Sequence, residues 1–168
     1  MRTFLLVVVL SGLSYSSLAG QPIEQGDIAP NWILADLQGK AVSLYEEAEQ
    51  GKWAVMIFWA TWCSNCKILL PEIVKIDRQK GSAPVAFYLM NVWEDKDPAE
   101  FVAEQDYQLP VIRQAEQVAQ RYGIRITPGI VVVDPDKRIQ YVRQPSDDVA
   151  TITRNLHGLL DIKHTSAH

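Results

Sequence analysis

Residues 58–71 read FWATWCSNCKILLP and contain both cysteines of the chain, Cys63 and Cys66. The chain enters this segment from Trp53–Trp59, an unbroken apolar run of strand length that is typical of a strand covered on both faces. After the first cysteine, apolar side chains recur at helical spacing from Ser64 to Gln79. The sequence therefore predicts a strand that delivers the chain to Cys63 at the point where a helix begins.

This position predicts reactive chemistry for the two thiols. A thiolate in the first turn of a helix faces unpaired backbone N–H groups and the positive end of the helix dipole, which stabilise it. Cys63 is therefore predicted as the nucleophile. Cys66 lies three residues further on, within disulfide range of Cys63 and in a more buried place.

A cysteine pair can also be a structural staple or part of a metal site. A purely structural disulfide here would close a very small loop, and the stabilisation from loop closure grows with loop length. A zinc site needs four ligands, and the remaining candidates are His157, His164 and His168. Their distance along the chain from the cysteines does not match a zinc finger, so redox chemistry is the favoured interpretation.

The rest of the sequence alternates short strands and helices. Strands are expected at 31–35, 40–43, 84–92, 130–133 and 138–142, and helices at 44–50, at 114–122, from Asp97-Pro98, and from Asp147 or Asp148 to Leu160. This alternation, closed by a hairpin and a helix, predicts one α/β domain with a mixed sheet.

The first 19 residues have the features of a secretory leader. Arg2 precedes the apolar run Phe4–Leu10, and Ser17-Leu18-Ala19 fits the small-residue rule for a cleavage site. The apolar run is shorter than the roughly 20 residues that a spanning helix needs, so cleavage is favoured over a retained membrane tether. We expect a leader at 1–19, a domain at 20–163 and a flexible tail at 164–168.

The net charge of the chain gives no sign of nucleic-acid binding. The net charge is −4, and it becomes −5 once the leader and its single charged residue, Arg2, are removed. This balance is ordinary for a soluble domain and gives no reason to expect nucleic-acid binding.

Export also bears on the redox state of the two cysteines. In an oxidising compartment, a lone cysteine pair is a disulfide unless something actively reduces it.

WATWCSNCKILLPEI, residues 59–73, resembles the active-site helix of the thioredoxin superfamily, with a Trp before the first cysteine and a Pro five residues after the second. Ile126-Thr127-Pro128 matches that superfamily's cis-proline position. GDIAPNWILADLQGKAVSL at 26–44 resembles the N-terminal hairpin of its TlpA/ResA-like branch of exported proteins. The 62 positions from Cys66 to Pro128 leave room for that branch's extra helix and strand. MNVWEDK at 90–96 resembles the segment that carries an active-site glutamate in some members.

The resemblance implies a thioredoxin-like α/β fold, in which helices flank a central mixed sheet, with an N-terminal β-hairpin and a central helix–strand insertion. It implies a cis bond at Thr127-Pro128 that brings the Thr127 backbone beside Cys63. This bond would prevent metal capture by the Cys63 sulfur and leave backbone groups to pair with an extended substrate. No bound cofactor and no metal are implied.

The resemblance also implies a third catalytic residue beside Cys63 and Cys66. From composition alone, the segment EDKD at 94–97 reads as a solvated loop. The family match instead implies that Glu94 is partly desolvated beneath the disulfide, has a raised pKa and takes the proton of Cys66. Contacts with substrate are implied for Trp62, Ser64, Asn65, Thr127 and Pro128.

Two departures from the thioredoxin pattern matter for mechanism. Plain thioredoxin has a buried aspartate six residues before its first cysteine, where this chain has Ile57. The usual proton acceptor is therefore missing, which gives Glu94 more weight. The dipeptide between the cysteines is Ser64-Asn65, and it lacks the histidine of strong oxidants, which favours a reductant.

The predicted function is that of an exported thiol–disulfide oxidoreductase that reduces disulfides of periplasmic protein substrates and is re-reduced by a membrane electron donor. Similar proteins act in cytochrome c maturation, sporulation or general periplasmic reduction. We expect a monomer that binds no nucleic acid. If the leader were retained, it would tether the domain to the membrane.

Other functions remain as alternatives. One is a disulfide oxidant or isomerase, and another is a non-enzymatic copper-binding module that uses Cys63, Cys66 and a tail histidine, because Cu(I) favours soft thiolates. Related copper carriers space their cysteines one residue wider. A peroxidase is excluded because its Pro-x-x-x-Thr-x-x-Cys pattern is absent, and Thr61 lies two residues before Cys63.

Overall fold

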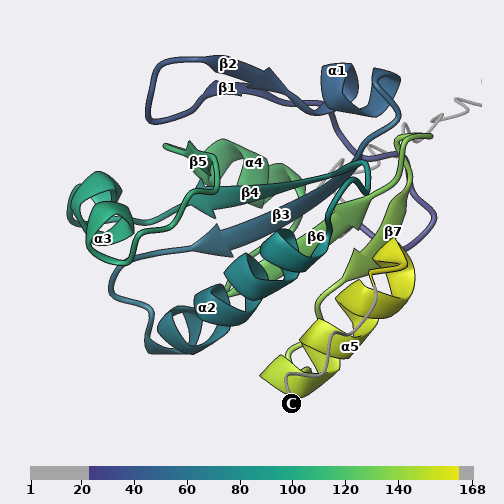
Figure 1. The fold of residues 1–168 in the computed structure, drawn as a ribbon. Helices are drawn as coiled ribbons and strands as arrows, with labels where there is room; N and C mark the ends of the chain where they lie inside the picture. Colours follow the sequence, from purple (N-terminus) through teal and green to yellow (C-terminus); the bar gives the residue numbers. More distant parts are fainter. Residues whose placement is uncertain (1–22, 163–168) are drawn as a thin grey trace, which may run out of the picture.

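The computed structural model describes residues 23–162, and in this range the chain forms seven strands and five helices (Figure 1). The strands are β1 Ile33–Ala35, β2 Ala41–Ser43, β3 Trp53–Trp59, β4 Val85–Asn91, β5 Val111–Ile112, β6 Gly129–Val133 and β7 Ile139–Val142. The helices are α1 Leu44–Glu49, α2 Ser64–Gln79, α3 Pro98–Glu104, α4 Glu116–Arg121 and α5 Val149–Leu160. The predicted leader at 1–19 and tail at 164–168 lie outside the described residues.

Five strands form one mixed sheet in the order β5-β4-β3-β6-β7. Strand β3 runs parallel to β4 and antiparallel to β6, and β7 is antiparallel to β6. The hairpin β1–β2 forms a separate two-stranded sheet above the main one (Figure 1). The predicted α/β fold with a mixed sheet and an N-terminal hairpin is thus confirmed.

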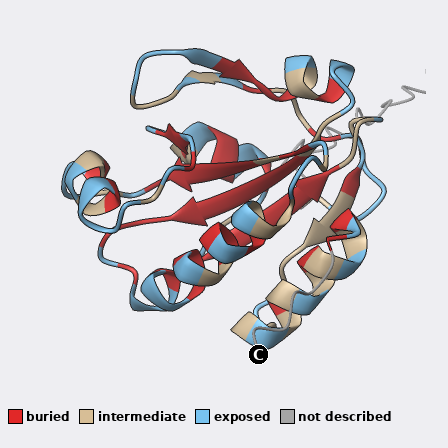
Figure 2. Cartoon of the chain, viewed as in Figure 1, coloured by how far each residue is buried: buried red, intermediate tan, exposed pale blue. Residues whose placement is uncertain are grey.

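Strand β3 is covered on both faces, as its apolar run predicts (Figure 2). Its odd-numbered residues from Val55 to Trp59 pack with α2 and α5, and its even-numbered residues from Ala54 to Phe58 pack with α4 and the segment around Trp32. All six are almost fully buried. Since each buried large apolar side chain stabilises the fold by about 1.5–3 kcal/mol, this strand anchors the sheet.

The insertion between β4 and α4 contains helix α3 and strand β5, as the resemblance implies. The sequence pattern assigned no residues to β5, because this strand is two residues long and follows Pro110. It forms because Val111 and Ile112 find parallel partners in β4. The hairpin covers its outer side, where the Leu37 backbone N–H donates to the Val111 carbonyl at 3.1 Å.

The sheet brings three loops to one edge. Because β3 and β4 are parallel, their carboxyl ends meet, with Trp59 opposite Asn91. Strand β6 is antiparallel to β3, so its first residue, Gly129, lies opposite Phe58 at the same edge. The loop into Cys63, the loop after Asn91 and the Thr127-Pro128 segment therefore converge.

Candidate active site

Cys63 and Cys66 form a disulfide at the N-terminus of α2, and their Cα atoms are 5.2 Å apart. Cys63 is the N-cap of the helix, and its Sγ accepts a hydrogen bond from the Cys66 backbone N–H at 3.1 Å. This places the sulfur at the positive end of the helix dipole, as predicted. Cys63 is 5% exposed and Cys66 is fully buried, so the predicted order of burial is confirmed.

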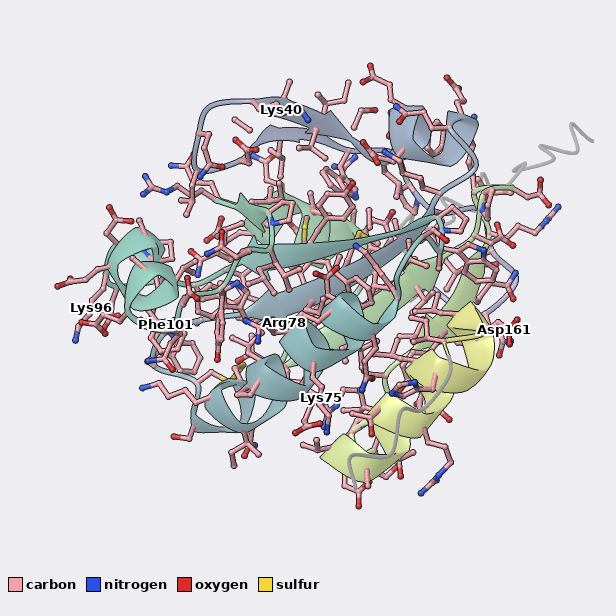
Figure 3. All side chains as sticks on the ribbon, in the orientation of Figure 1. Lys40, Lys75, Arg78, Lys96, Phe101 and Asp161 are labelled. Atoms are coloured by element: carbon pink, nitrogen blue, oxygen red, sulfur yellow. A yellow bond between two sulfur atoms is a disulfide. The ribbon has the colours of Figure 1, made fainter. Side chains whose placement is uncertain are left out.

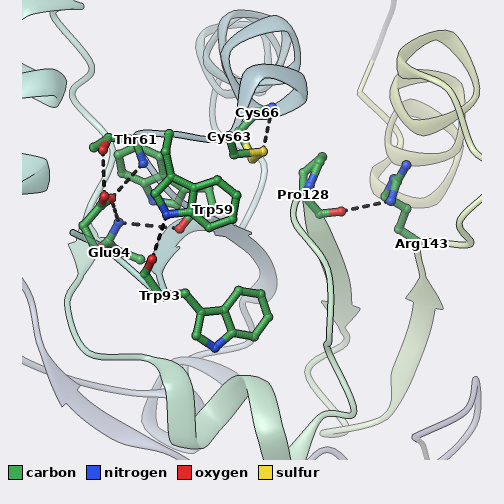
Figure 4. Close-up of a disulfide and its surroundings, with 10 residues drawn as sticks. Trp59, Thr61, Cys63, Cys66, Trp93, Glu94, Pro128 and Arg143 are labelled. Carbon is green, nitrogen blue, oxygen red and sulfur yellow. Dashed lines mark hydrogen bonds between the residues drawn. A yellow bond between two sulfur atoms is a disulfide. The ribbon is translucent and has the colours of Figure 1, made fainter. Parts of the chain in front are cut away.

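Glu94 lies in the loop after β4 and is bonded to the chain that leads into Cys63. Its carboxylate accepts hydrogen bonds from the backbone N–H and the hydroxyl of Thr61, both at 2.7 Å. It also accepts from the Asn91 side-chain amide at 2.9 Å and the Asp95 backbone N–H at 3.2 Å. Among the described residues, these hydrogen bonds run to the loops beside the disulfide and to neither cysteine (Figure 4).

The predicted rise in the pKa of Glu94 is wrong. Partial burial raises the pKa of this carboxyl, but the hydrogen bonds from Thr61, Asn91 and Asp95 lower it by more, so the net shift is downward. Hydrogen bonds that stabilise the carboxylate thus outweigh desolvation. With the disulfide formed, the lowered pKa favours an ionised Glu94 carboxylate, which accepts these hydrogen bonds, over a protonated carboxylic acid.

Trp62 is held by the same loop through its indole. Its Nε1–H donates to the Trp93 carbonyl at 2.7 Å, and the Trp93 backbone N–H donates to the Glu116 carboxylate of α4 at 3.0 Å. Trp93 has a φ of 51°, in the left-handed region that non-glycine residues rarely adopt. The loop at 93–94 therefore bonds to both residues that precede Cys63, Thr61 and Trp62.

Below the cysteines the site is apolar. Ile57, at the position of the missing aspartate, is fully buried in the cluster that also contains Cys66. Trp59 is fully buried, and its ring lies 5.5 Å from that of Phe101, which α3 directs toward the N-terminal end of α2 (Figure 3). Lys67 Nζ lies 5.8 Å from the centre of the same Phe101 ring. Trp59 thus belongs to the core, whereas Trp62 is 51% exposed.

The Thr127-Pro128 peptide bond is cis, as the resemblance implies. Figure 4 shows Pro128 on one side of the disulfide and Glu94 with Thr61 on the other. The Pro128 carbonyl accepts a hydrogen bond from Arg143 Nη1 at 3.0 Å. The predicted substrate contacts Trp62, Ser64 and Asn65 are exposed, and Thr127 is half-buried.

Sequence reasoning missed five contributors to this arrangement, namely Thr61, Asn91, Trp93, Glu116 and Arg143. Asn91 gave a usable signal, because it is a polar residue at the end of an otherwise apolar strand. Thr61 gave no local signal as a hydrogen-bond donor, because its partner Glu94 is 33 residues away. Glu116 and Arg143 had no local signal for these contacts, because Trp93 is 23 residues from Glu116 and Pro128 is 15 residues from Arg143.

No cluster of three or more His, Cys, Asp or Glu side chains suited to a metal ion occurs within residues 23–162. His157, one histidine considered as a zinc ligand, lies near the end of α5, where its Nδ1 is 2.9 Å from the Ile162 carbonyl oxygen. The other two, His164 and His168, lie outside the described residues.

A family model described as the AhpC/TSA family matches residues 25–142, which include both cysteines and Pro128. The chain belongs to the AhpC/TSA family. The thiol–disulfide oxidoreductase ResA of Geobacillus thermodenitrificans is 30% identical over 152 residues, which cover 84% of each chain. ResA of Bacillus subtilis is 29% identical over 145 residues, covering 82% of this chain and 80% of that protein.

The fold is also that of solved thioredoxin-like structures. The thioredoxin domain of a thiol-disulfide oxidoreductase from Bacteroides vulgatus superposes with a TM-score of 0.69 at 22% identity, covering 82% of this chain and 99% of that one. The thioredoxin-like fold and the placement in the ResA-like branch are thereby confirmed. The chain is a thiol–disulfide oxidoreductase of the AhpC/TSA family, and Cys63 and Cys66 are its CxxC pair.

Proposed function

We propose that this enzyme reduces disulfides of protein substrates in the periplasm. The observation that carries the proposal is the Cys63–Cys66 disulfide at the N-terminus of α2, across from the cis-bonded Pro128. A helix N-terminus stabilises a thiolate on Cys63 once the pair is reduced. The Ser64-Asn65 dipeptide adds no imidazolium that would stabilise the reduced form further, which favours a reductant.

The reaction runs in two thiol–disulfide exchanges. The Cys63 thiolate attacks one sulfur of the substrate disulfide, forms a mixed disulfide and releases the other substrate sulfur as a thiolate, which takes up a proton. The Cys66 sulfur then attacks Cys63 and releases the second substrate sulfur as a thiolate, which takes up a proton to replace the one that Cys66 loses. Two electrons pass to the substrate, and the enzyme is left with the Cys63–Cys66 disulfide.

We propose that Glu94 is a positioning residue in this reaction. Its carboxylate holds the Thr61 N–H and hydroxyl at 2.7 Å, and Thr61 is two residues from the nucleophile. Trp62, Ser64 and Asn65 present an exposed surface beside Cys63 for the substrate chain. The Thr127-Pro128 backbone, on the opposite side, would pair with an extended segment of the same substrate.

A reductant in an oxidising compartment needs a source of electrons, because each turnover leaves the enzyme oxidised. We propose a membrane thiol–disulfide donor for this step, export by the leader at 1–19, and action as a monomer. The sequence resemblance to the TlpA/ResA-like branch leads us to propose a role of the cytochrome c maturation type. Within the part of the chain that the structure describes, no helix is long and apolar enough to cross a membrane.

The first test is the reduction potential of the Cys63–Cys66 pair, measured by equilibration with defined thiol–disulfide buffers. We expect a value near or below about −270 mV, that of a reductant such as thioredoxin. A value near about −120 mV would identify an oxidant and reverse the proposed direction of electron flow.

A second test traps the substrate and identifies the attacking sulfur. Cys66→Ser should accumulate a mixed disulfide with exported proteins, because the resolving thiol is gone. Cys63→Ser serves as the matched control and should trap far less, since Cys66 is fully buried. Equal trapping by the two variants would contradict the assignment of Cys63 as nucleophile.

A further inference from the structure

Arg143 follows β7 and reaches back to the cis-proline segment. Its backbone N–H continues the sheet by donating to the Ile130 carbonyl at 2.9 Å. Its side chain donates from Nη1 to the Pro128 carbonyl and from Nη2 to the Asp147 carbonyl, each at 3.0 Å. Figure 4 shows Pro128 lying between the disulfide and this guanidinium.

The guanidinium is half-buried, and its charge is directed at backbone carbonyls. Within residues 23–162, the ion pairs join other side chains and none includes Arg143. The nearby Asp147 carboxylate instead accepts hydrogen bonds from the Tyr141 hydroxyl at 2.7 Å and the Gln144 N–H at 2.9 Å. Arg143 Nε is buried without a hydrogen-bond partner among the described residues. Because this half-buried guanidinium donates to two backbone carbonyls and takes part in none of the ion pairs of the described range, its charge serves to hold those two peptide units.

We propose that Arg143 is a positioning residue that fixes the Pro128 carbonyl and thereby keeps the Thr127-Pro128 backbone ready to pair with a protein substrate. The proposal rests on the function proposed above and extends it to a residue 15 positions beyond Pro128. A charge-assisted hydrogen bond to a carbonyl holds that peptide unit more firmly than a neutral donor does. A pre-formed backbone binds an extended segment better, because less conformational freedom is lost on binding.

This role predicts that Arg143 matters for substrates with a polypeptide backbone and not for small disulfides. A small disulfide meets the Cys63 sulfur without pairing to Thr127, so its reaction should not depend on Arg143. The test compares two probes with the same leaving group. One is an extended peptide whose single cysteine carries a chromogenic aromatic thiol as a mixed disulfide, and the other is the same cysteine with blocked termini and no flanking residues.

The reduced full-length enzyme is mixed with each probe, and release of the aromatic thiol is followed over a range of probe concentrations. Each enzyme molecule reacts once in this assay, because the reaction leaves it oxidised. For Arg143→Met we expect the second-order rate constant of this single turnover on the peptide to fall about 5- to 50-fold, mainly through weaker binding of the peptide, with less than about a twofold change on the small probe. Arg143→Lys, which keeps the charge and one donor, should recover part of the loss. The matched control is Arg138→Met, because Arg138 Nη1 also donates to a backbone carbonyl, that of Gly26 at 2.9 Å.

An unchanged peptide reaction in Arg143→Met would overturn the proposal. So would an equal loss on both probes, which would mean that Arg143 acts on the Cys63 sulfur or on overall stability. If Arg143→Met does not fold, as judged by circular dichroism, Arg143→Lys carries the same comparison of the two probes. If the wild-type enzyme releases the aromatic thiol from neither probe, the proposed function itself is wrong. If the wild-type enzyme reacts with the peptide, a failed prediction for the variants contradicts only the role proposed for Arg143.

Discussion

Glu94 illustrates how hydrogen bonds decide the charge of a single side chain. It is partly buried, and burial alone would favour the protonated acid. Donors from Thr61, Asn91 and Asp95 surround its carboxylate and reverse that preference, so its pKa is lowered. The partial burial of Glu94 therefore does not raise its pKa toward neutral pH.

The direction of this shift sets a pH dependence for Glu94→Gln. Because the folded pKa lies below the unfolded value of about 4.3, ionised Glu94 stabilises the fold above that pH, and this contribution is lost as pH falls through the folded pKa. We expect Glu94→Gln to be about 1–2 kcal/mol less stable at pH 7, because an amide cannot accept all the donors. In urea unfolding, the difference in free energy of unfolding between wild type and Glu94→Gln should be constant between pH 6 and 8. This difference should narrow below about pH 4.

The matched control for this measurement is Asp95→Asn, which removes a charge from the same loop at an exposed side chain. It should change stability by less than about 0.5 kcal/mol. If the difference in free energy of unfolding between wild type and Glu94→Gln changes from pH 6 to 8, Glu94 titrates in that range. This outcome would contradict the lowered pKa of Glu94.

At the scale of elements, the first residue of β6 has room for no side chain. A Cβ at Gly129 would lie 2.6 Å from Ile124 Cγ2 and 3.4 Å from Phe58 Cβ. Because Gly129 pairs with Phe58 in the sheet and follows the cis-proline, a shift of its backbone would disturb the site, so the Ile124 side chain would have to move to admit a methyl group. The close approach of strand and loop therefore requires glycine.

We expect Gly129→Ala to lower the free energy of unfolding by about 1–3 kcal/mol, the usual cost of overpacking, as measured by urea denaturation. Gly158→Ala is the control, because it adds the same methyl group to an exposed position in α5 with nothing within 4 Å. That change should stabilise the protein by about 0.5–1 kcal/mol, since alanine favours the helix. Equal effects of the two substitutions would contradict the close-contact explanation.

For the whole molecule, the sheet order predicts a gradient of local stability. Strand β3 has neighbours on both sides and apolar cover on both faces, whereas β5 is a two-residue strand at the edge of the main sheet. Amide hydrogen exchange followed by NMR should therefore be slowest in β3 and approach the free energy of global unfolding there. Amides of β5 and α3 should exchange through local opening at lower free energy, and equally slow exchange in β3 and β5 would refute this order.

The sequence by itself determined the chemistry and most of the scaffold. Strand β3 and helix α2 follow the apolar patterns at 53–59 and 64–79, because periodicity and end signals depend on residues within a few positions of each other. The redox pair could be predicted from its spacing and its place before a helix for the same reason, whereas the cis bond at Pro128 was expected from the family resemblance. Strand β5 could not, because two residues carry no period and become a strand through pairing with β4.

The tertiary structure alone decided how the site is held and charged. Thr61 and Glu94 are 33 residues apart, Trp62 and Trp93 are 31 apart, and Pro128 and Arg143 are 15 apart. Such contacts depend on the strand order and on the register that places Trp59 opposite Asn91 and Phe58 opposite Gly129. A motif names Glu94 as a candidate, but its ionisation also depends on the backbone N–H and the hydroxyl of Thr61, which arrive from another loop. The ionisation of Glu94 and the fixing of the Pro128 peptide unit both require neighbours that only the fold brings together, and a local pattern does not encode those neighbours.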